Sequence, residues 1–120
     1  MDKLGIGRKM ERVVMARWVW HGYNCWQPPR SKWTSQDVWG LFDFVAIKPL
    51  CPVNLVQVKR HRASELVVAK DAMEAFCRDY SCPIACFVVS WQKNASRTLF
   101  RAYEYVLTGW VDAGQWTEEL

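Results

Sequence analysis

The stretch from Leu41 to Arg60 constrains the fold of this chain more than any other, because it predicts two strands that pair with each other. The first run, 41–47, is aromatic and β-branched apart from Leu41, Asp43 and one alanine, and the second run, 53–58, is also rich in β-branched residues. Between them lie two prolines, which cannot donate to a ladder, so we expect the chain to reverse around Leu50. Antiparallel pairing about that point sets residues opposite each other when their numbers sum to about 100.

This register predicts a polar cluster on an otherwise apolar hairpin. Asp43 is expected to face Gln57, and because side chains alternate along a strand, Lys59 shares that face. A desolvated acid beside a desolvated ammonium is costly, so a function or a salt bridge must explain the cluster. Asp43, the Gln57 side-chain oxygen and the Val58 carbonyl would suit a hard divalent cation, with Lys59 steadying negative charge. The alternative is an ordinary cross-strand pair of Asp43 and Lys59.

Two motifs carry a resemblance to a known family. Asp43 followed by Gln-Val-Lys at 57–59 resembles the core of the PD-(D/E)xK nuclease superfamily, with Gln where Glu is usual. The segment 7–12, Gly-Arg-Lys-Met-Glu-Arg, resembles the opening of the archaeal-type Holliday junction resolvases of that superfamily. The order helix, strand, hairpin, helix, strand also fits that family, and these parts cover residues 7–80.

The resemblance implies a single restriction-endonuclease-like α/β domain over 1–120, with a mixed, mostly antiparallel sheet of about five strands and flanking helices. It also implies a symmetric homodimer that cleaves four-way (Holliday) junctions in DNA recombination and repair. The catalytic residues would be Glu11, Asp43, Gln57 and Lys59. Glu11, Asp43, Gln57 and the Val58 carbonyl would bind Mg²⁺, with Mn²⁺ as a substitute and no small-molecule cofactor. Gln57 removes one negative charge, which leaves open whether one metal ion or two are held.

Basic residues in three segments are expected to position the DNA phosphates. They lie in the first helix, in the loop after the first strand, where Ser31 is expected to join them as a DNA-binding residue, and at the end of the hairpin: Arg8, Lys9, Arg12; Arg30, Lys32; and Arg60, His61, Arg62. Ser31 or Ser35 could take the place of a serine that matters for the substrate in the resolvases, and an ordinary turn serine is the alternative.

Several of these residues have a plainer interpretation when they stand alone. Glu11 would then be a solvated acid that pairs with Arg8, and His61 a surface histidine. For Asp37 a turn or a cap before the strand is favoured over a further acid in the site. Two other functions also stay open, namely a restriction- or repair-type endonuclease and a non-catalytic DNA-binding module that has kept the fold.

Composition sets the class of protein. The 120 residues are 51% hydrophobic and 23% charged, which is typical of one globular domain, and the net charge of +4 permits an anionic partner. No run is long and apolar enough to span a bilayer, so we expect a soluble protein. The first residues lack the order of a signal peptide, so we expect the protein in a reducing, cytoplasmic compartment of a cell or a virus-infected host. The five cysteines fit reduced thiols better than disulfides, and the spacing of Cys77, Cys82 and Cys86 disfavours zinc.

The rest of the chain predicts further elements. Apolar spacing favours helices over 6–21, ended by Gly22, and over 63–80; strands are expected at 23–27, 84–89 and 98–105, with a linker at 92–97 and no assignment beyond Thr108. The eight tryptophans cannot all lie in the core. Some could stack on unpaired bases or form a dimer surface, and scattered partial burial is the alternative.

Overall fold

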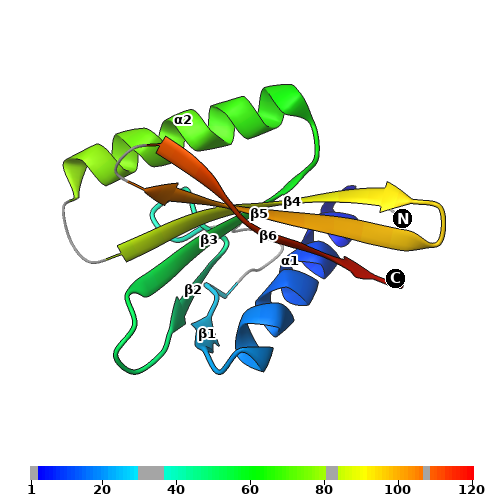
Figure 1. The fold of residues 1–120 in the computed structure, drawn as a ribbon, viewed down its shortest axis with the longest axis horizontal. Helices are drawn as coiled ribbons and strands as arrows, with labels where there is room; N and C mark the ends of the chain where they lie inside the picture. Colours follow the sequence, from blue (N-terminus) through cyan, green and yellow to red (C-terminus); the bar gives the residue numbers. More distant parts are fainter. Residues whose placement is uncertain (1–2, 30–36, 81–83, 107–108) are drawn as a thin grey trace.

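A computed structural model describes residues 3–29, 37–80, 84–106 and 109–120. Two helices and six strands follow the order α1 (Lys3–Trp20), β1 (Asn24–Trp26), β2 (Phe44–Ile47), β3 (Val53–Arg60), α2 (Ala63–Asp79), β4 (Ile84–Asn94), β5 (Arg97–Val106) and β6 (Gly109–Glu118). The strands form one mixed sheet in chain order, with α2 over one face and α1 over the other (Figure 1). The molecule is therefore a single three-layer α/β domain.

The hairpin register matches the prediction. Phe44 pairs with Val56, Val45 with Leu55 and Ala46 with Asn54, so the residue numbers of every pair sum to 100. At Leu50 φ is 63°, the left-handed value that lets the chain reverse between the prolines. β3 is two residues longer than expected and ends at Arg60.

The first strand of the hairpin begins later than predicted. Residues 41–43 were expected in it, but β2 starts at Phe44. The backbone of Phe42 bonds instead to Val38, as acceptor at 2.7 Å and as donor at 3.0 Å. Those bonds close a tight loop in which Trp39 and Gly40 have positive φ, so the chain reaches the sheet only at Asp43. Asp37 belongs to this loop, where its carbonyl accepts the Gly40 N–H at 3.1 Å, as the turn interpretation expected.

Each face of the sheet has its own core because side chains alternate along the central strands. Even-numbered residues of β3 pack beneath α1, whose apolar stripe Met10, Val14 and Trp18 is buried. Odd-numbered residues of β3 face α2, where Leu66, Ala69 and Met73 are buried. β3 and β4 are parallel, and α2 makes the crossover between them. Both predicted helices are confirmed, with α1 over 3–20 where 6–21 was expected and α2 over 63–79 where 63–80 was expected.

Gly22 ends α1 as predicted. The Gly22 N–H donates to the Val19 carbonyl at 2.9 Å, and the Tyr23 N–H donates to the Trp18 carbonyl at 3.1 Å. With Gly22 at φ 93°, these are the two bonds of a Schellman motif. The chain thereby turns from α1 straight into β1.

The sheet has six strands where about five were expected. β4 runs to Asn94 and β5 starts at Arg97, so most of the predicted linker 92–97 continues the two strands of one hairpin. Its polar composition was misleading because this end of the hairpin is exposed on both faces. β6, in the unassigned tail, pairs with β5 and is mostly exposed, so it lacks the apolar alternation that marks a strand.

No disulfide joins the described cysteines Cys25, Cys51, Cys77 and Cys86. Burial raises the pKa of the Cys25 thiol. Cys77 and Cys86 touch, with their sulfur atoms 3.4 Å apart, while Cys82 lies outside the described residues. No helix in the described part of the chain is long and apolar enough to cross a membrane.

Candidate functional site

The predicted site residues gather at one end of the sheet. β1 ends there at Trp26, β2 begins there at Phe44, and β3 finishes there, because β2 is antiparallel to both neighbours. Asp43 therefore stands beside the second half of β3. Gln27 and the two prolines that follow β1 lie at the same end, as does the start of α2.

Asp43 is held by the backbone of β3. Its N–H donates to the Val56 carbonyl at 2.8 Å, and its Oδ2 accepts the Val58 N–H at 2.6 Å. The carboxylate thus takes the place that the next strand residue would occupy in the ladder, and it is only 8% exposed. In a strand the N–H and C=O of one residue point to the same side, so the Val58 carbonyl also points toward Asp43.

Gln57 and Lys59 line one cavity, of about 380 Å³, between β3 and α2. The rest of its wall comes from Leu41 and from one face of α2, beginning at Ser64. Gln57 is 8% exposed, and its Oε1 is buried without a hydrogen-bond partner among the described residues. An orphaned buried oxygen is costly and marks a place where a ligand fits. Lys59 has no ion pair within the described chain, so the structure does not contain the simple Asp43–Lys59 bridge.

Glu11 comes from the opposite face of the sheet. It is buried, with 6% exposure, and lines a cavity of about 300 Å³ with Arg8, Arg12 and the segment 27–29. This location contradicts the interpretation of Glu11 as a solvated surface acid. Because 27–29 continues β1 past the end of the sheet at which Asp43 lies, Glu11 faces the same end as the hairpin residues.

The structure describes some of the residues predicted to bind DNA and does not describe the others. Arg8 and Arg12 are exposed beside Glu11, and Lys9 is half-buried. Arg60, His61 and Arg62 are exposed at the end of β3; the Arg60 guanidinium lies 5.4 Å from the centre of the Trp91 ring, and Arg62 pairs with Glu65 at 3.8 Å. Arg30, Ser31, Lys32 and Ser35 lie outside the described residues, so their predicted roles stay predictions.

Oxygen atoms of the kind that Mg²⁺ prefers lie toward this end of the sheet. They are the buried carboxylates of Asp43 and Glu11, the Oε1 of Gln57, which has no hydrogen-bond partner among the described residues, and the Val58 carbonyl. Within the described ranges no three His, Cys, Asp or Glu side chains are close enough to hold a metal ion. The amide and the carbonyl would therefore have to complete such a site.

Sequence analysis missed Glu65. This residue in the first turn of α2 lines the same cavity as Gln57 and Lys59. A signal existed, because only His61 and Arg62 separate β3 from α2, and so short a connection places the first turn of the helix beside the end of the strand. Glu65 supplies a carboxylate to the cavity in which Gln57 carries none.

Models of known protein families, curated proteins and solved structures were compared with this chain, and none matches it. The function is therefore argued from the site itself.

Proposed function

We propose that the chain is a Mg²⁺-dependent endonuclease that cleaves four-way DNA junctions. The observation that carries the proposal is the contact of Asp43 with β3, where its carboxylate accepts the Val58 N–H at 2.6 Å. The residue before Val58 in this strand is Gln57, whose buried Oε1 has no hydrogen-bond partner among the described residues. A structural side chain at Gln57 would have its oxygen satisfied, whereas a metal ligand keeps it available. The order helix, three strands, helix, strand is also the order that the resemblance implies.

The chain's residues would divide the work as follows. Asp43, the Gln57 amide oxygen, the Val58 carbonyl and Glu11 would hold the cation. Bound Mg²⁺ would supply an activated water and charge stabilisation at the scissile phosphate. Lys59, in the same cavity as Gln57, carries a positive charge that would stabilise the charge developing on that phosphate. The partial burial of Lys59 keeps its ammonium from being fully screened by water.

The path of the DNA would follow the exposed cations. Arg60, His61 and Arg62 form a basic rim at the end of β3, and Arg8 and Arg12 lie at the same end on α1. Phosphates on either side of the scissile bond would thus meet donors from both faces of the sheet. Preference for a four-way junction, cut by two sites of a symmetric homodimer, rests on the resemblance of segment 7–12 to the resolvases.

A direct experiment separates this function from its alternatives. The pure protein is incubated with linear, nicked and four-way DNA of the same sequence, with Mg²⁺, with Mn²⁺ and with EDTA. We expect metal-dependent cutting of the four-way DNA alone. Cutting of linear DNA at equal rate would identify a restriction- or repair-type endonuclease, and binding without any cutting would identify a non-catalytic DNA-binding module.

Lys59→Ala is expected to slow junction cleavage by about 100-fold or more, because one fixed charge at a transition state contributes several kcal/mol in a partly dry site. Junction affinity measured in EDTA should change by less than about threefold, since one phosphate contact at most is lost. Lys70→Ala, which removes a half-buried lysine of α2 whose ammonium lies 4.2 Å from the centre of the Tyr103 ring, is the control. A Lys59→Ala enzyme with the parent rate would show that Lys59 has no role in the chemistry.

The double variant Arg60→Ala/Arg62→Ala is expected to weaken DNA binding and to lower the salt slope by about two phosphate contacts. Removing two exposed guanidiniums should leave the fold intact, since Arg62 forms only a half-exposed pair with Glu65. The control is Arg78→Ala/Arg97→Ala, which removes two exposed arginines outside segment 60–62, one in the last turn of α2 and one at the start of β5. A plot of log affinity against log salt that is unchanged in the first double variant would place the DNA elsewhere.

A further inference from the structure

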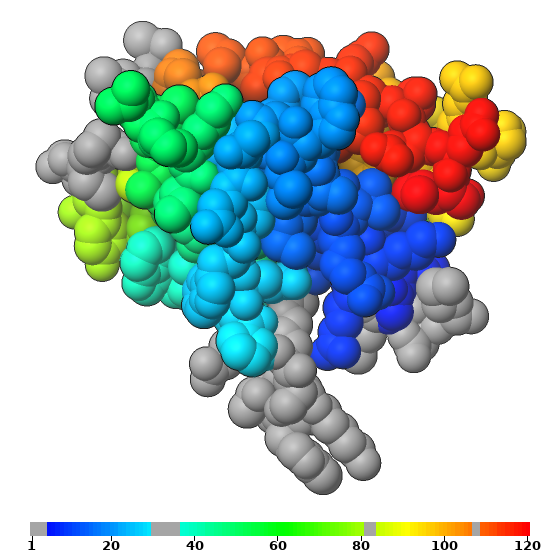
Figure 2. All heavy atoms as spheres, turned by 90° about the horizontal axis from the view of Figure 1, so that it is seen from below, coloured from blue at the N-terminus to red at the C-terminus, as the bar shows by residue number. Residues whose placement is uncertain are grey.

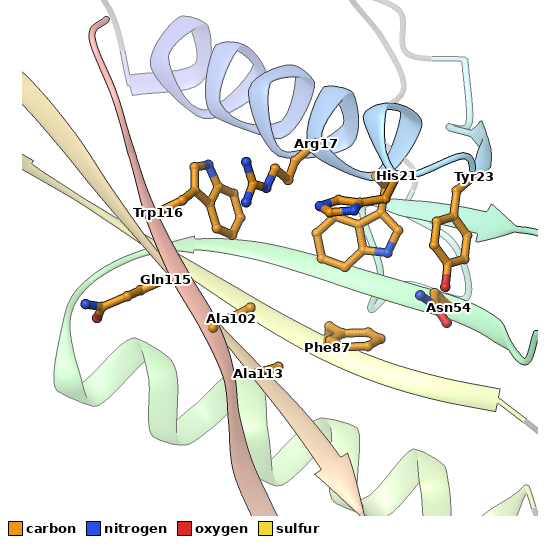
Figure 3. Close-up of a pocket in the computed structure, with 11 residues that line it drawn as sticks. Arg17, His21, Tyr23, Asn54, Phe87, Ala102, Ala113, Gln115 and Trp116 are labelled. Carbon is orange, nitrogen blue, oxygen red and sulfur yellow. The ribbon is translucent and has the colours of Figure 1, made fainter.

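A second cavity, of about 220 Å³, lies between α1 and the β4–β6 part of the sheet. In Figure 3, Arg17 of α1 and His21, which follows α1, lie above this cavity. Trp116 and Tyr23 lie at its two sides, and Phe87, Ala102 and Ala113 lie below it. In Figure 2, which views this face, α1 and β6 lie side by side. Neither Glu11, Asp43, Gln57 nor Lys59 lines this cavity, so it is separate from the proposed cleavage site.

The cavity exists because one helix cannot cover this face of a six-stranded sheet. α1 packs mainly on β1 and β3, and the sheet continues past it through β5 to β6. Small residues, Ala102, Ala113 and Gly114, stand where larger side chains would have filled the gap. Beside them β5 and β6 carry a register irregularity next to Ala102, and Gly114 has φ 121°.

The aromatic walls are fixed before any ligand enters. Trp116 stacks on Phe100 with ring centres 5.1 Å apart and planes 10° apart. Phe87 meets the edge of Trp18 at 5.5 Å. Trp18 is in turn fixed by Asn54. With the Asn54 amide oriented to satisfy its hydrogen bonds, the amide oxygen accepts the Trp18 indole N–H at 3.0 Å. Rigid rings of this kind bind a planar ligand at low entropic cost.

The rim of the cavity is cationic. The Arg17 guanidinium lies 5.1 Å from the centre of the Trp116 ring. Lys48, from the β2–β3 turn, donates to the His21 carbonyl at 3.0 Å and lies 5.4 Å from the Tyr23 ring centre. None of the described residues that line the cavity is acidic. A ligand with a planar ring and an adjacent anion therefore complements both the walls and the rim.

We propose that this cavity binds one nucleotide, with its base beside Trp116 and Phe87 and its phosphate at Arg17. A cavity of roughly 150 Å³ accepts a benzene ring, so about 220 Å³ accepts one base and excludes a base pair. The ligand is a free mononucleotide or an unpaired nucleotide of a DNA strand, which share this chemistry. The site goes beyond the proposed cleavage activity and depends on none of its residues.

The test has two arms, both in EDTA so that DNA stays uncut. In the first, thymidine monophosphate, thymidine and inorganic phosphate are titrated while the indole N–H signals are followed by NMR, with Trp116 assigned from a Trp116→Phe variant. In the second, the affinity for a duplex with one unpaired thymidine is compared with that for the fully paired duplex. We expect the nucleotide to shift the Trp116 signal well beyond the other two probes, or the unpaired base to tighten binding by about tenfold.

Two pairs of variants connect either effect to the cavity. Ala113→Phe fills the cavity from its exposed rim, and Thr117→Phe adds the same ring to β6 at an exposed position that does not line it. Arg17→Gln removes the cation that lines the cavity beside Trp116, and Arg101→Gln removes an exposed arginine that does not line the cavity. We expect Ala113→Phe and Arg17→Gln to abolish the effect and both controls to keep it, with all four proteins showing parent-like thermal unfolding.

The outcomes separate this site from the nuclease. A pocket-dependent shift with the mononucleotide identifies the free ligand, and pocket-dependent tightening with the unpaired base identifies DNA. The nucleotide site is refuted if neither experiment shows an effect, if phosphate alone shifts the Trp116 signal as much as the nucleotide does, or if Ala113→Phe retains the effect. If only Arg17→Gln fails to fold, Ala113→Phe still decides the question. Mg²⁺-dependent cleavage of junctions would survive each of these failures.

Discussion

Replacing Asp43 by Asn is expected to lower the rate of junction cleavage by about 1,000-fold or more while leaving junction affinity within about twofold of the parent. Asparagine keeps the shape of the side chain, and its amide oxygen can still accept the Val58 N–H that Oδ2 accepts at 2.6 Å. The fold of the hairpin should therefore persist. What disappears is the negative charge that would hold the proposed cation, and the exposed arginines proposed to contact DNA are untouched.

The control for this variant is Asp71→Asn, which makes the same change at an exposed position on α2. Cleavage is measured on a labelled four-way junction in Mg²⁺, and affinity on the same junction in EDTA. Thermal unfolding of both variants verifies that each is folded. If Asp43→Asn cleaves at a rate near that of the parent, the assignment of Asp43 to a metal site is wrong.

The hairpin could be predicted from sequence because its determinants are local. Two prolines fixed the turn, strand alternation fixed the faces, and the observed pairs follow the expected register. The same register also explains why Asp43 lies beside the part of β3 that carries Gln57. The burial of Glu11 could not be predicted from local pattern, because a charged residue at the edge of a helical face is usually solvated. Glu11 is buried because residues 27–29, which follow β1, pack beside it.

Other features depended on contacts that no local pattern carries. Residues 41–43 have strand propensity, yet Val38 takes the backbone hydrogen bonds of Phe42 in a tight loop that the apolar pattern does not mark. β6 is held by the ladder with β5 and buries few side chains, which leaves no periodic signal. Glu65 enters the Gln57 cavity only because α2 follows β3 after two residues.

The number of tryptophans predicts only part of how they are placed in the fold. The expectation that not all lie in the core is confirmed, since Trp18 and Trp91 are buried while Trp20, Trp26 and Trp39 are 78%, 57% and 71% exposed. Trp116 is half-buried at the cavity between α1 and β6. Their number predicted aromatic surface, but only the packing of Trp116 on Phe100 distinguishes a fixed wall from an exposed ring.

Gln57→Glu is expected to make the stability of the protein depend on Mg²⁺. Gln57 is 8% exposed, so a carboxylate at this position places a negative charge where little water reaches it, in a cavity that Glu65 also lines. Without metal the variant should lose about 1–2 kcal/mol of unfolding free energy, which corresponds to a Tm lower by about 5–10 °C. Bound Mg²⁺ would neutralise that charge, and because it binds only the folded state, it should raise the Tm of this variant more than that of the parent.

The same variant should need less metal for activity. A neutral amide oxygen is a weaker Mg²⁺ ligand than a carboxylate, so the concentration for half-maximal cleavage is expected to fall by about fivefold or more. Gln92→Glu is the matched control, because Gln92 is exposed on β4 and bonds only to Asn94. Mg²⁺ titrations of Tm and of junction cleavage test the two effects separately. If Gln57→Glu is as stable as the parent without metal and needs as much Mg²⁺ or more, the oxygen of Gln57 does not face a cation, and its lack of a hydrogen-bond partner has another cause.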